Sequence, residues 1–224
     1  DGDTLATVGN ADDDVKLWDV ASGELRLRLQ GHNANRCHLA CVAFSPDGKI
    51  LASGDSHSVV KLWDLASGKE RATLRHHWGV GSLAFSPDGK TLATSGGSAK
   101  TVKLWDVVTG MERAPAIEHG SRVRCVTFSP DGSLLAVGGG DGTVVLWDPV
   151  TRKRRATLSG HTDGVNDLAF SPDGTVLATA NFERTIKLWN VIEAIKEQAD
   201  NKVRQGRANG GLLAPFGSHT GELP

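Results

Sequence analysis

The hydrophobic positions of this chain fall into short runs separated by polar turns. Residues 160–190, GHTDGVNDLAFSPDGTVLATANFERTIKLWN, contain three runs, at 165–170, 176–180 and 185–189. Each run has five or six residues and is rich in Val, Leu, Ile, Thr and aromatic side chains, which predicts β-strands. The first run ends at the sequence SPDG, in which Pro presets φ and Gly accepts a positive φ, as a tight turn requires.

The same unit recurs along the chain at a nearly fixed period. LWD or LWN triplets are centred on Trp18, Trp63, Trp105, Trp147 and Trp189, at spacings of 45, 42, 42 and 42 residues. The SPDG turn begins at Ser45, Ser86, Ser129 and Ser171. A period near 42 with several strands per unit is typical of propeller blades. The pattern therefore predicts an all-β propeller.

These motifs resemble those of the WD-repeat β-propeller family, over about residues 1–190. Gly31-His32 and Gly160-His161 are similar to the family's glycine–histidine mark, and Trp63-Asp64, Trp105-Asp106 and Trp147-Asp148 to its Trp–Asp pair. The resemblance implies a platform for protein–protein interaction and no enzymatic activity. The regular SPDG turns resemble bacterial members in particular, in which such propellers often adjoin a kinase or another signalling domain.

We expect five blades of four antiparallel strands, at about 1–30, 31–75, 76–117, 118–159 and 160–190. The first blade lacks its innermost strand, because Asp1-Gly2 looks like the end of an SPDG turn, and the last loses the pattern after Asn190. Residues 191–205 place apolar residues at i, i+4 spacing, which predicts an amphipathic helix. Residues 206–224 are Gly-rich and aperiodic, and we expect a flexible tail.

The resemblance also implies a larger ring. A closing blade would need a strand like VxxLAFSPDG, whereas residues 212–216 offer only LLAPF, with Pro in mid-run. Because WD-repeat rings most often have seven blades, we expect further blades upstream, or self-association, to close the ring. Whether a catalytic domain is fused upstream stays open.

Composition narrows the classes of partner. Lys and Arg number 25 against 26 Asp and Glu, so the net charge of −1 favours neither nucleic acid nor a membrane surface as partner. No apolar run approaches 18 residues, and no signal peptide is visible. We therefore expect a cytoplasmic protein that binds a protein or peptide and needs no cofactor.

Three cysteines are too few for a disulfide framework. Cys41 and Cys125 each precede the Phe of a first strand by three residues, and we expect both to be half-buried free thiols. Cys37 and Cys41 with His32 and His38 could suggest a metal cluster. Their spacing fits no closed four-ligand pattern, so we expect no metal.

Each blade carries a His, a hydroxyl residue, an acid and a Trp that could be mistaken for a catalytic set. The resemblance implies instead that these side chains hydrogen-bond in series and lock the blade. A buried Trp N–H or imidazole without a partner costs about 1–3 kcal/mol, which agrees with that role. The expected network comprises His32, Ser53, Trp63, His76, Thr94, Trp105, His119, Asp141, Trp147, His161, Thr179 and Trp189.

The residue types of this network differ from blade to blade. Six residues before each Trp, the acid position holds Asp12, His57, Ala99, Asp141 and Glu183. Blade three therefore lacks the acid, and blade four has Val137 in place of a hydroxyl residue. In blade two, Asp55 could substitute for the acid, although it lies two residues early.

Trp78 is the only Trp outside the periodic position. Equivalent places hold Ser121 and Asp163, and in the family such residues surround the channel mouth, where partners bind. An exposed Trp is a typical binding hot spot, although Trp78 could instead pack on a neighbouring loop. The candidate partner-binding residues are His77, Trp78, Arg122 and Asp163.

The alternative function is a small-ligand or hydrolytic site at the channel mouth. Its candidate residues would be His38, His77, Trp78, Arg122 and Asp163, which form no recognisable reaction set.

Overall fold

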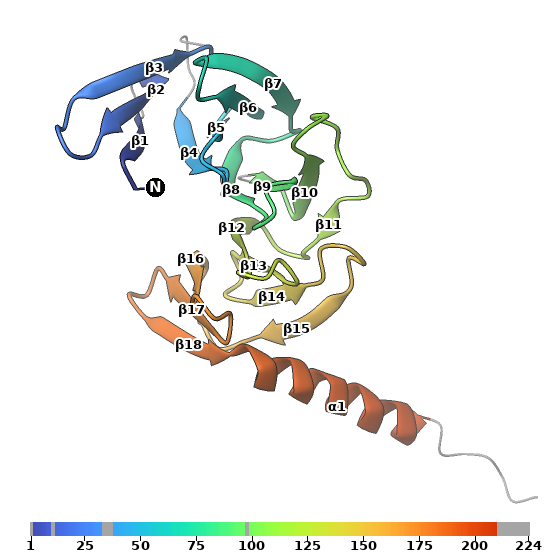
Figure 1. Cartoon of the computed structure of the whole chain (residues 1–224). Helices are drawn as coiled ribbons and strands as arrows, with labels where there is room; N and C mark the ends of the chain where they lie inside the picture. Colours follow the sequence, from blue (N-terminus) through green and yellow to red (C-terminus); the bar gives the residue numbers. More distant parts are fainter. Residues whose placement is uncertain (1, 10–11, 33–37, 97–98, 210–224) are drawn as a thin grey trace, which may run out of the picture.

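The computed structural model describes residues 2–9, 12–32, 38–96 and 99–209, which form five antiparallel sheets and one helix (Figure 1). Blade one holds β1 (Thr4–Gly9), β2 (Asp12–Asp19) and β3 (Leu25–Gln30). Blade two holds β4 (Leu39–Phe44), β5 (Ile50–Asp55), β6 (Val59–Asp64) and β7 (Lys69–Arg75). Blade three holds β8 (Val80–Phe85), β9 (Thr91–Gly96), β10 (Thr101–Asp106) and β11 (Ile117–Glu118). Blade four holds β12 (Val123–Phe128), β13 (Leu135–Gly139), β14 (Val144–Trp147) and β15 (Arg154–Leu158), and blade five holds β16 (Val165–Phe170), β17 (Val176–Asn181) and β18 (Ile186–Asn190).

The blades stand side by side in an arc, and the innermost strands β4, β8, β12 and β16 line its inner wall (Figure 1). Blades one and five are three-stranded and face each other across a gap in the ring. The predicted five-bladed propeller with incomplete first and last blades is confirmed.

The SPDG turn is held by its own side chains. Ser45 Oγ accepts a hydrogen bond from the Ile50 N–H at 2.9 Å and donates one to Asp47 Oδ1 at 2.6 Å. Gly48 has φ of +66°, a conformation that glycine adopts without steric cost. The turns that begin at Ser86, Ser129 and Ser171 repeat these bonds.

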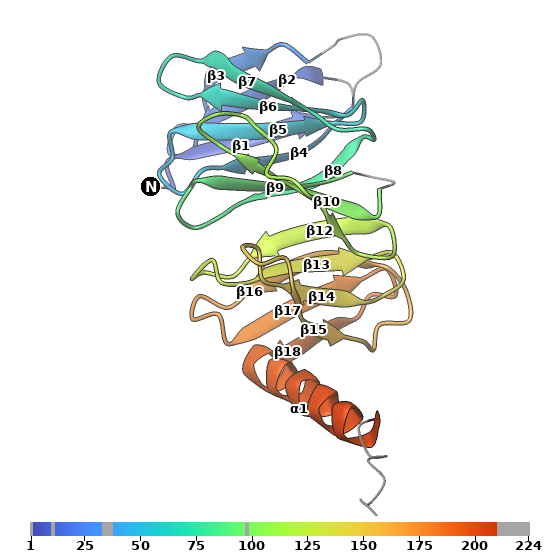
Figure 2. The same cartoon turned by 90° about the vertical axis from the view of Figure 1, so that its right-hand side faces the viewer.

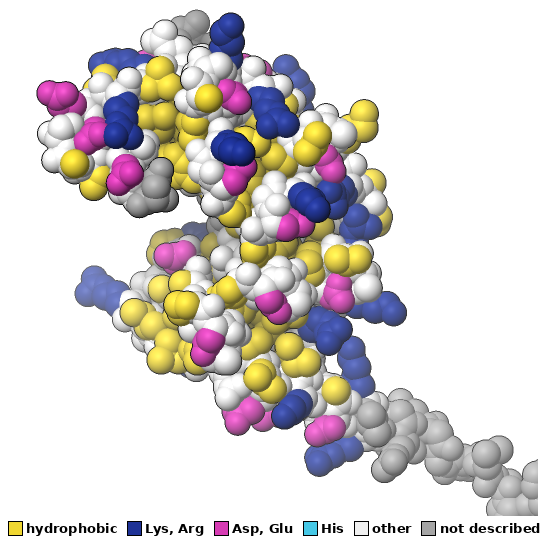
Figure 3. Space-filling model, in the orientation of Figure 1, with side chains coloured by type: hydrophobic (Ala, Val, Ile, Leu, Met, Phe, Trp, Pro, Cys, Tyr) yellow, Lys and Arg dark blue, Asp and Glu magenta, His cyan; other side chains and the backbone are white. Residues whose placement is uncertain are grey.

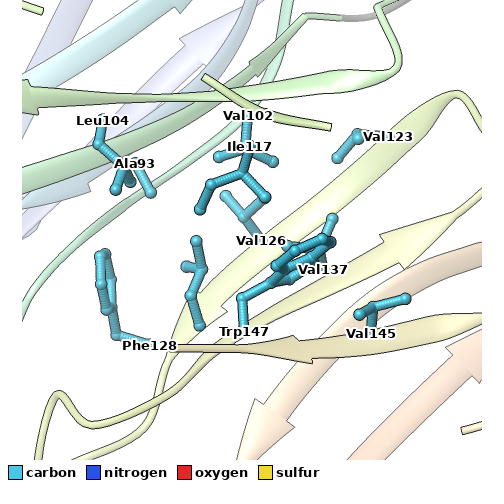
Figure 4. Close-up of a cluster of buried hydrophobic side chains, with 11 residues drawn as sticks. Ala93, Val102, Leu104, Ile117, Val123, Val126, Phe128, Val137, Val145 and Trp147 are labelled. Atoms are coloured by element: carbon cyan, nitrogen blue, oxygen red, sulfur yellow. The ribbon is translucent and has the colours of Figure 1, made fainter. Parts of the chain in front are cut away.

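The hydrophobic core lies between neighbouring blades. At each junction, the Trp of one blade packs against two aliphatic residues of the blade before it, and at the junction of blades three and four these are Val102 and Leu104 against Trp147 (Figure 4). The same arrangement places Trp63, Trp105 and Trp189 against blades one, two and four. Blade stability therefore depends on the next blade as well as on each sheet's own hydrogen bonds.

Helix α1 (Val191–Asn209) stands where blade five would need a fourth strand. The Glu193 N–H donates to Asn190 Oδ1 at 3.1 Å, which caps the first turn. Val191, Ala194 and Ile195 pack onto blades four and five, and the helix then extends away from the arc (Figure 2). The predicted helix is confirmed, but it continues through residues 206–209, where the sequence predicts the tail. Residues 210–224 lie outside the described part.

Candidate functional site: the loop face

The chain reversals lie on two opposite faces of the arc. The SPDG turns and the turns between third and fourth strands lie on one face, which we call the turn face. The links between blades and the turns between second and third strands lie on the other, which we call the loop face: residues 56–58, 76–79, 119–122, 140–143, 161–164 and 182–185. Figure 2 views the arc from its edge, with both sets of reversals in profile. All four candidate partner-binding residues belong to the loop face.

Beneath the loop face, blade two contains a complete series of hydrogen bonds. Trp63 Nε1 donates to Ser53 Oγ at 2.8 Å, and His32 Nε2 lies 2.7 Å from the same oxygen. His32 Nδ1 lies 2.8 Å from Asp55 Oδ2. If Nδ1 carries the imidazole proton, Nε2 is the acceptor for the Ser53 hydroxyl, and every group in the series has a partner. Asp55 therefore completes blade two.

Blades three and five repeat the central part of this series. Thr94 Oγ1 bonds His76 Nε2 and accepts from Trp105 Nε1 at 2.7 Å. Thr179 Oγ1 lies 2.6 Å from His161 Nε2 and accepts from Trp189 Nε1 at 2.9 Å. In blade five, Glu183 holds the acid position but does not bond to His161, because it accepts a hydrogen bond from the Thr162 hydroxyl instead.

Blade four differs from the expected network. His119 and Trp147 are buried, yet neither imidazole nitrogen of His119 nor Trp147 Nε1 has a hydrogen-bond partner among the described residues. Asp141 accepts from the Thr143 N–H and hydroxyl, at 3.1 and 2.7 Å, and not from His119. The physical reason is Val137, which lies beside Trp147 (Figure 4) and has no hydroxyl to bridge the two rings.

Burial lowers the pKa of the imidazole in blades three, four and five. Desolvation, together with the charge of Lys103, lowers the pKa of His76 to about 4. Desolvation also lowers the pKa of His119 and of His161. Burial tends to raise the pKa of Asp55, but the hydrogen bonds from His32 and from the Val59 N–H leave it below its usual value. An ionised Asp55 is a suitable acceptor at the end of the blade-two series.

Trp78 is the more exposed of two large aromatic residues on this surface, with 59% of its area accessible against 52% for Phe182. The link at residues 76–79, which carries Trp78, packs closely against the turn at residues 56–58 between the second and third strands of blade two. A Cβ at Gly79 would lie 2.4 Å from the Ser56 carbonyl oxygen, so only glycine fits there. The Cβ of Trp78 lies over Gly96, and the indole ring extends into solvent.

The other candidate residues lie on several links of the loop face and do not form a chemical unit. His38, His77, Arg122 and Asp163 are all exposed. No hydrogen bond or ion pair among the described residues joins His77, Trp78, Arg122 and Asp163 to one another. The geometry assembles no nucleophile and base from this set.

The two described cysteines lie under the blades. Cys41 is half-buried and Cys125 fully buried, deeper than predicted, and both are free thiols. Burial raises the pKa of each thiol to about 12, so neither is a thiolate near neutral pH. Of the four residues whose spacing argues against a metal cluster, His32 is already bonded to Ser53 and Asp55, and Cys37 lies outside the described residues.

The repeat motif found by comparison matches the chain in phase with the blades. The family model described as WD domain, G-beta repeat, matches residues 23–64, 68–106, 116–148 and 152–190. Each match ends at the residue after a periodic Trp, and together the matches cover more than half of the chain. The chain belongs to the WD-repeat family.

Two curated WD-repeat relatives show limited similarity. The small ribosomal subunit protein RACK1y of Oryza sativa subsp. japonica is 34% identical over 80 residues, which are 36% of this chain and 23% of the relative. The small ribosomal subunit protein RACK1 of Drosophila melanogaster is 35% identical over 74 residues, which are 33% of this chain and 22% of the relative. The matched part is thus less than a quarter of either relative. In the described part of this WD-repeat chain, no helix is long and apolar enough to cross a membrane.

Proposed function

We propose that this WD-repeat chain is a non-catalytic scaffold whose loop face docks a protein or peptide. The observation that carries the proposal is Trp78, an exposed indole held by a tightly packed link on a rigid arc. Trp is enriched among the residues that dominate binding energy at protein interfaces. The two relatives are named as proteins of the small ribosomal subunit, and a place in a larger assembly is consistent with such a role.

The same reasoning disfavours the alternative, a hydrolytic or small-ligand site at the channel mouth. The polar series under the loop face recurs from blade to blade, as a structural device does. We propose a cytoplasmic location, because the two described cysteines are free thiols, which fits a reducing compartment, and we propose that the chain needs no cofactor. The proposal includes a role as the accessory domain of a signalling protein.

Affinity capture tests the docking proposal. The immobilised chain should retain a specific protein from lysate, and Trp78→Ala should reduce its recovery at least about tenfold, as loss of a hot spot does. Val150→Ala is the matched control, because Val150 is an exposed apolar residue on the turn face. Equal recovery by wild type and Trp78→Ala would remove Trp78 from the docking site.

We further propose that the end faces of the arc are covered when the ring closes, by further blades or by self-association. The residues three and one before each periodic Trp are at most 4% exposed in blades one to four, but Ile186 and Leu188 in blade five are 73% and 71% exposed. At the other end, Leu5 is 54% exposed, whereas the Leu paired with Trp in every other blade is fully buried. Both end faces are thus built like blade junctions.

A further inference from the structure

A shallow groove of about 210 Å³ opens at the loop-face end of the inner wall, and its lining residues are Gly81, Arg122, Val123, Arg124 and Asn166. Gly81, Arg124 and Asn166 occupy the second position of β8, β12 and β16, which are neighbouring inner strands. Because Gly81 has no side chain, the groove stays open at the β8 position. Arg124 and Asn166 line the same groove from β12 and β16. Trp78 lies three residues before Gly81, on the link that leads into β8.

The groove carries two cations and no acid. Among the described residues, no carboxylate lies within ion-pair distance of Arg122 or Arg124. Arg124 is oriented by neutral groups instead: its Nε lies 3.4 Å from Asn166 Oδ1, and its guanidinium stands 4.2 Å from the centre of the exposed Phe182 ring.

Three arginines elsewhere in the blades are arranged differently. Arg26, Arg113 and Arg155 each form an ion pair with the Asp that follows a periodic Trp. A guanidinium fork that lacks such a partner favours a planar anion, because it can donate two parallel hydrogen bonds to a carboxylate. The charge of this groove is therefore complementary to an acidic side chain.

We propose that this groove binds a carboxylate side chain of an acidic peptide, while a neighbouring apolar residue of that peptide contacts Trp78. The inference rests on the proposed docking function and names the chemistry of its partner. A peptide fits better than a nucleic acid, since two arginines at one point do not make the basic stripe that a phosphate backbone requires. Asn166 supplies an amide N–H for the second carboxylate oxygen.

Fluorescence anisotropy with two short labelled peptides tests the proposal. One peptide alternates Glu with Leu, and the other has Gln in place of Glu. At low salt, the Glu peptide should bind at least about tenfold more tightly than the Gln peptide, the factor expected for a charge-assisted bond. Arg122→Gln and Arg124→Gln should each remove most of that difference. Arg71→Gln is the matched control, because Arg71 is exposed on β7, the outer strand of blade two.

A second measurement avoids dependence on the variants. In the wild-type chain, NMR signals of the Arg122 and Arg124 Nε–H and of the Asn166 amide should shift as the Glu peptide is added, while those of Arg71 stay in place. Equal binding of the two peptides, with Trp78 dependence, would overturn the acidic specificity and leave the docking function standing. Absence of binding, or tighter binding of a single-stranded oligonucleotide through the same arginines, would overturn the inference.

Discussion

At the scale of single residues, the periodic Trp side chains have two separable roles. Trp63, Trp105 and Trp147 are all buried between blades. Trp63 and Trp105 also donate to a hydroxyl that is bonded to a histidine, whereas Trp147 has no such acceptor. Substitution to Ala removes both contributions, and substitution to Phe removes mainly the hydrogen bond.

Truncation to Ala of Trp63, Trp105 or Trp147 should lower the free energy of unfolding by about 3–5 kcal/mol, the usual result for a buried aromatic residue. Trp63→Phe should cost about 1–3 kcal/mol more than Trp147→Phe, because it leaves Ser53 without its donor. Denaturant melts measure both differences. Losses under about 1 kcal/mol for the Ala variants would mean that the rings are not core, contrary to the blade assignment.

Val137→Thr should stabilise blade four by at most about 1 kcal/mol, because the new hydroxyl can join His119 to Trp147 as Thr94 joins its two partners in blade three. Val137→Ala, which removes volume and adds no hydroxyl, is the control and should destabilise. Thermal melts distinguish the variants. A lower melting temperature for Val137→Thr than for wild type would show that the pocket around Val137 has repacked.

At the scale of the blade, the buried histidines make stability depend on pH. Burial holds the pKa of His76 at about 4, below the ordinary value of 6.5, and also lowers the pKa of His119 and His161. The unfolded chain therefore binds more protons in this range than the folded chain does. The stabilisation is complete above about pH 6.5 and is lost as the pH falls towards 4.

We expect the free energy of unfolding at pH 5 to be lower than at pH 7.5 by roughly 2 kcal/mol from His76 alone. Denaturant melts at the two pH values measure this change. His76→Gln should reduce the difference, since Gln does not titrate. Stability that rises on acidification between these values would contradict the burial of neutral histidines.

Most of the strands, turns and blade boundaries could be predicted from the sequence, because strand alternation, the SPDG turns and the Trp period are local signals. From the sequence, Asp55 is only a possible substitute for the missing acid of blade two, because it lies two residues before the acid position of the motif. Its contact with His32 depends on the three-dimensional path of the chain, which the motif does not encode. The helix end was missed since Gly206 is a helix breaker by propensity but α1 passes through it. Arg124 and Asn166 come together across two blades, and no local pattern encodes that contact.

At the scale of the whole molecule, each blade of the arc packs against the next, and the outward face of blade five is exposed to solvent. Ile186 and Leu188 occupy the positions that a following Trp covers at every other junction. Figure 3 shows hydrophobic side chains on blade five beside the gap. A face of this kind drives association in water.

The purified 224-residue chain should therefore self-associate. Light scattering should give a mass above that of the monomer, and Leu188→Asp should shift it towards the monomer. Val150→Asp, at an exposed apolar site on the turn face, should leave the mass unchanged. A compact wild-type monomer that excludes a hydrophobic dye would show that the end faces are covered without a partner.

The central claim is that a partner docks on the loop face, and hydrogen–deuterium exchange of the captured complex tests it most directly. We predict slower exchange in the links and turns around Trp78, at residues 76–79, 119–122 and 161–164, with exchange unchanged in the SPDG turns at 45–48, 86–89 and 129–132. Protection confined to the SPDG turns, with the segment around Trp78 exchanging as in the free chain, would contradict the account.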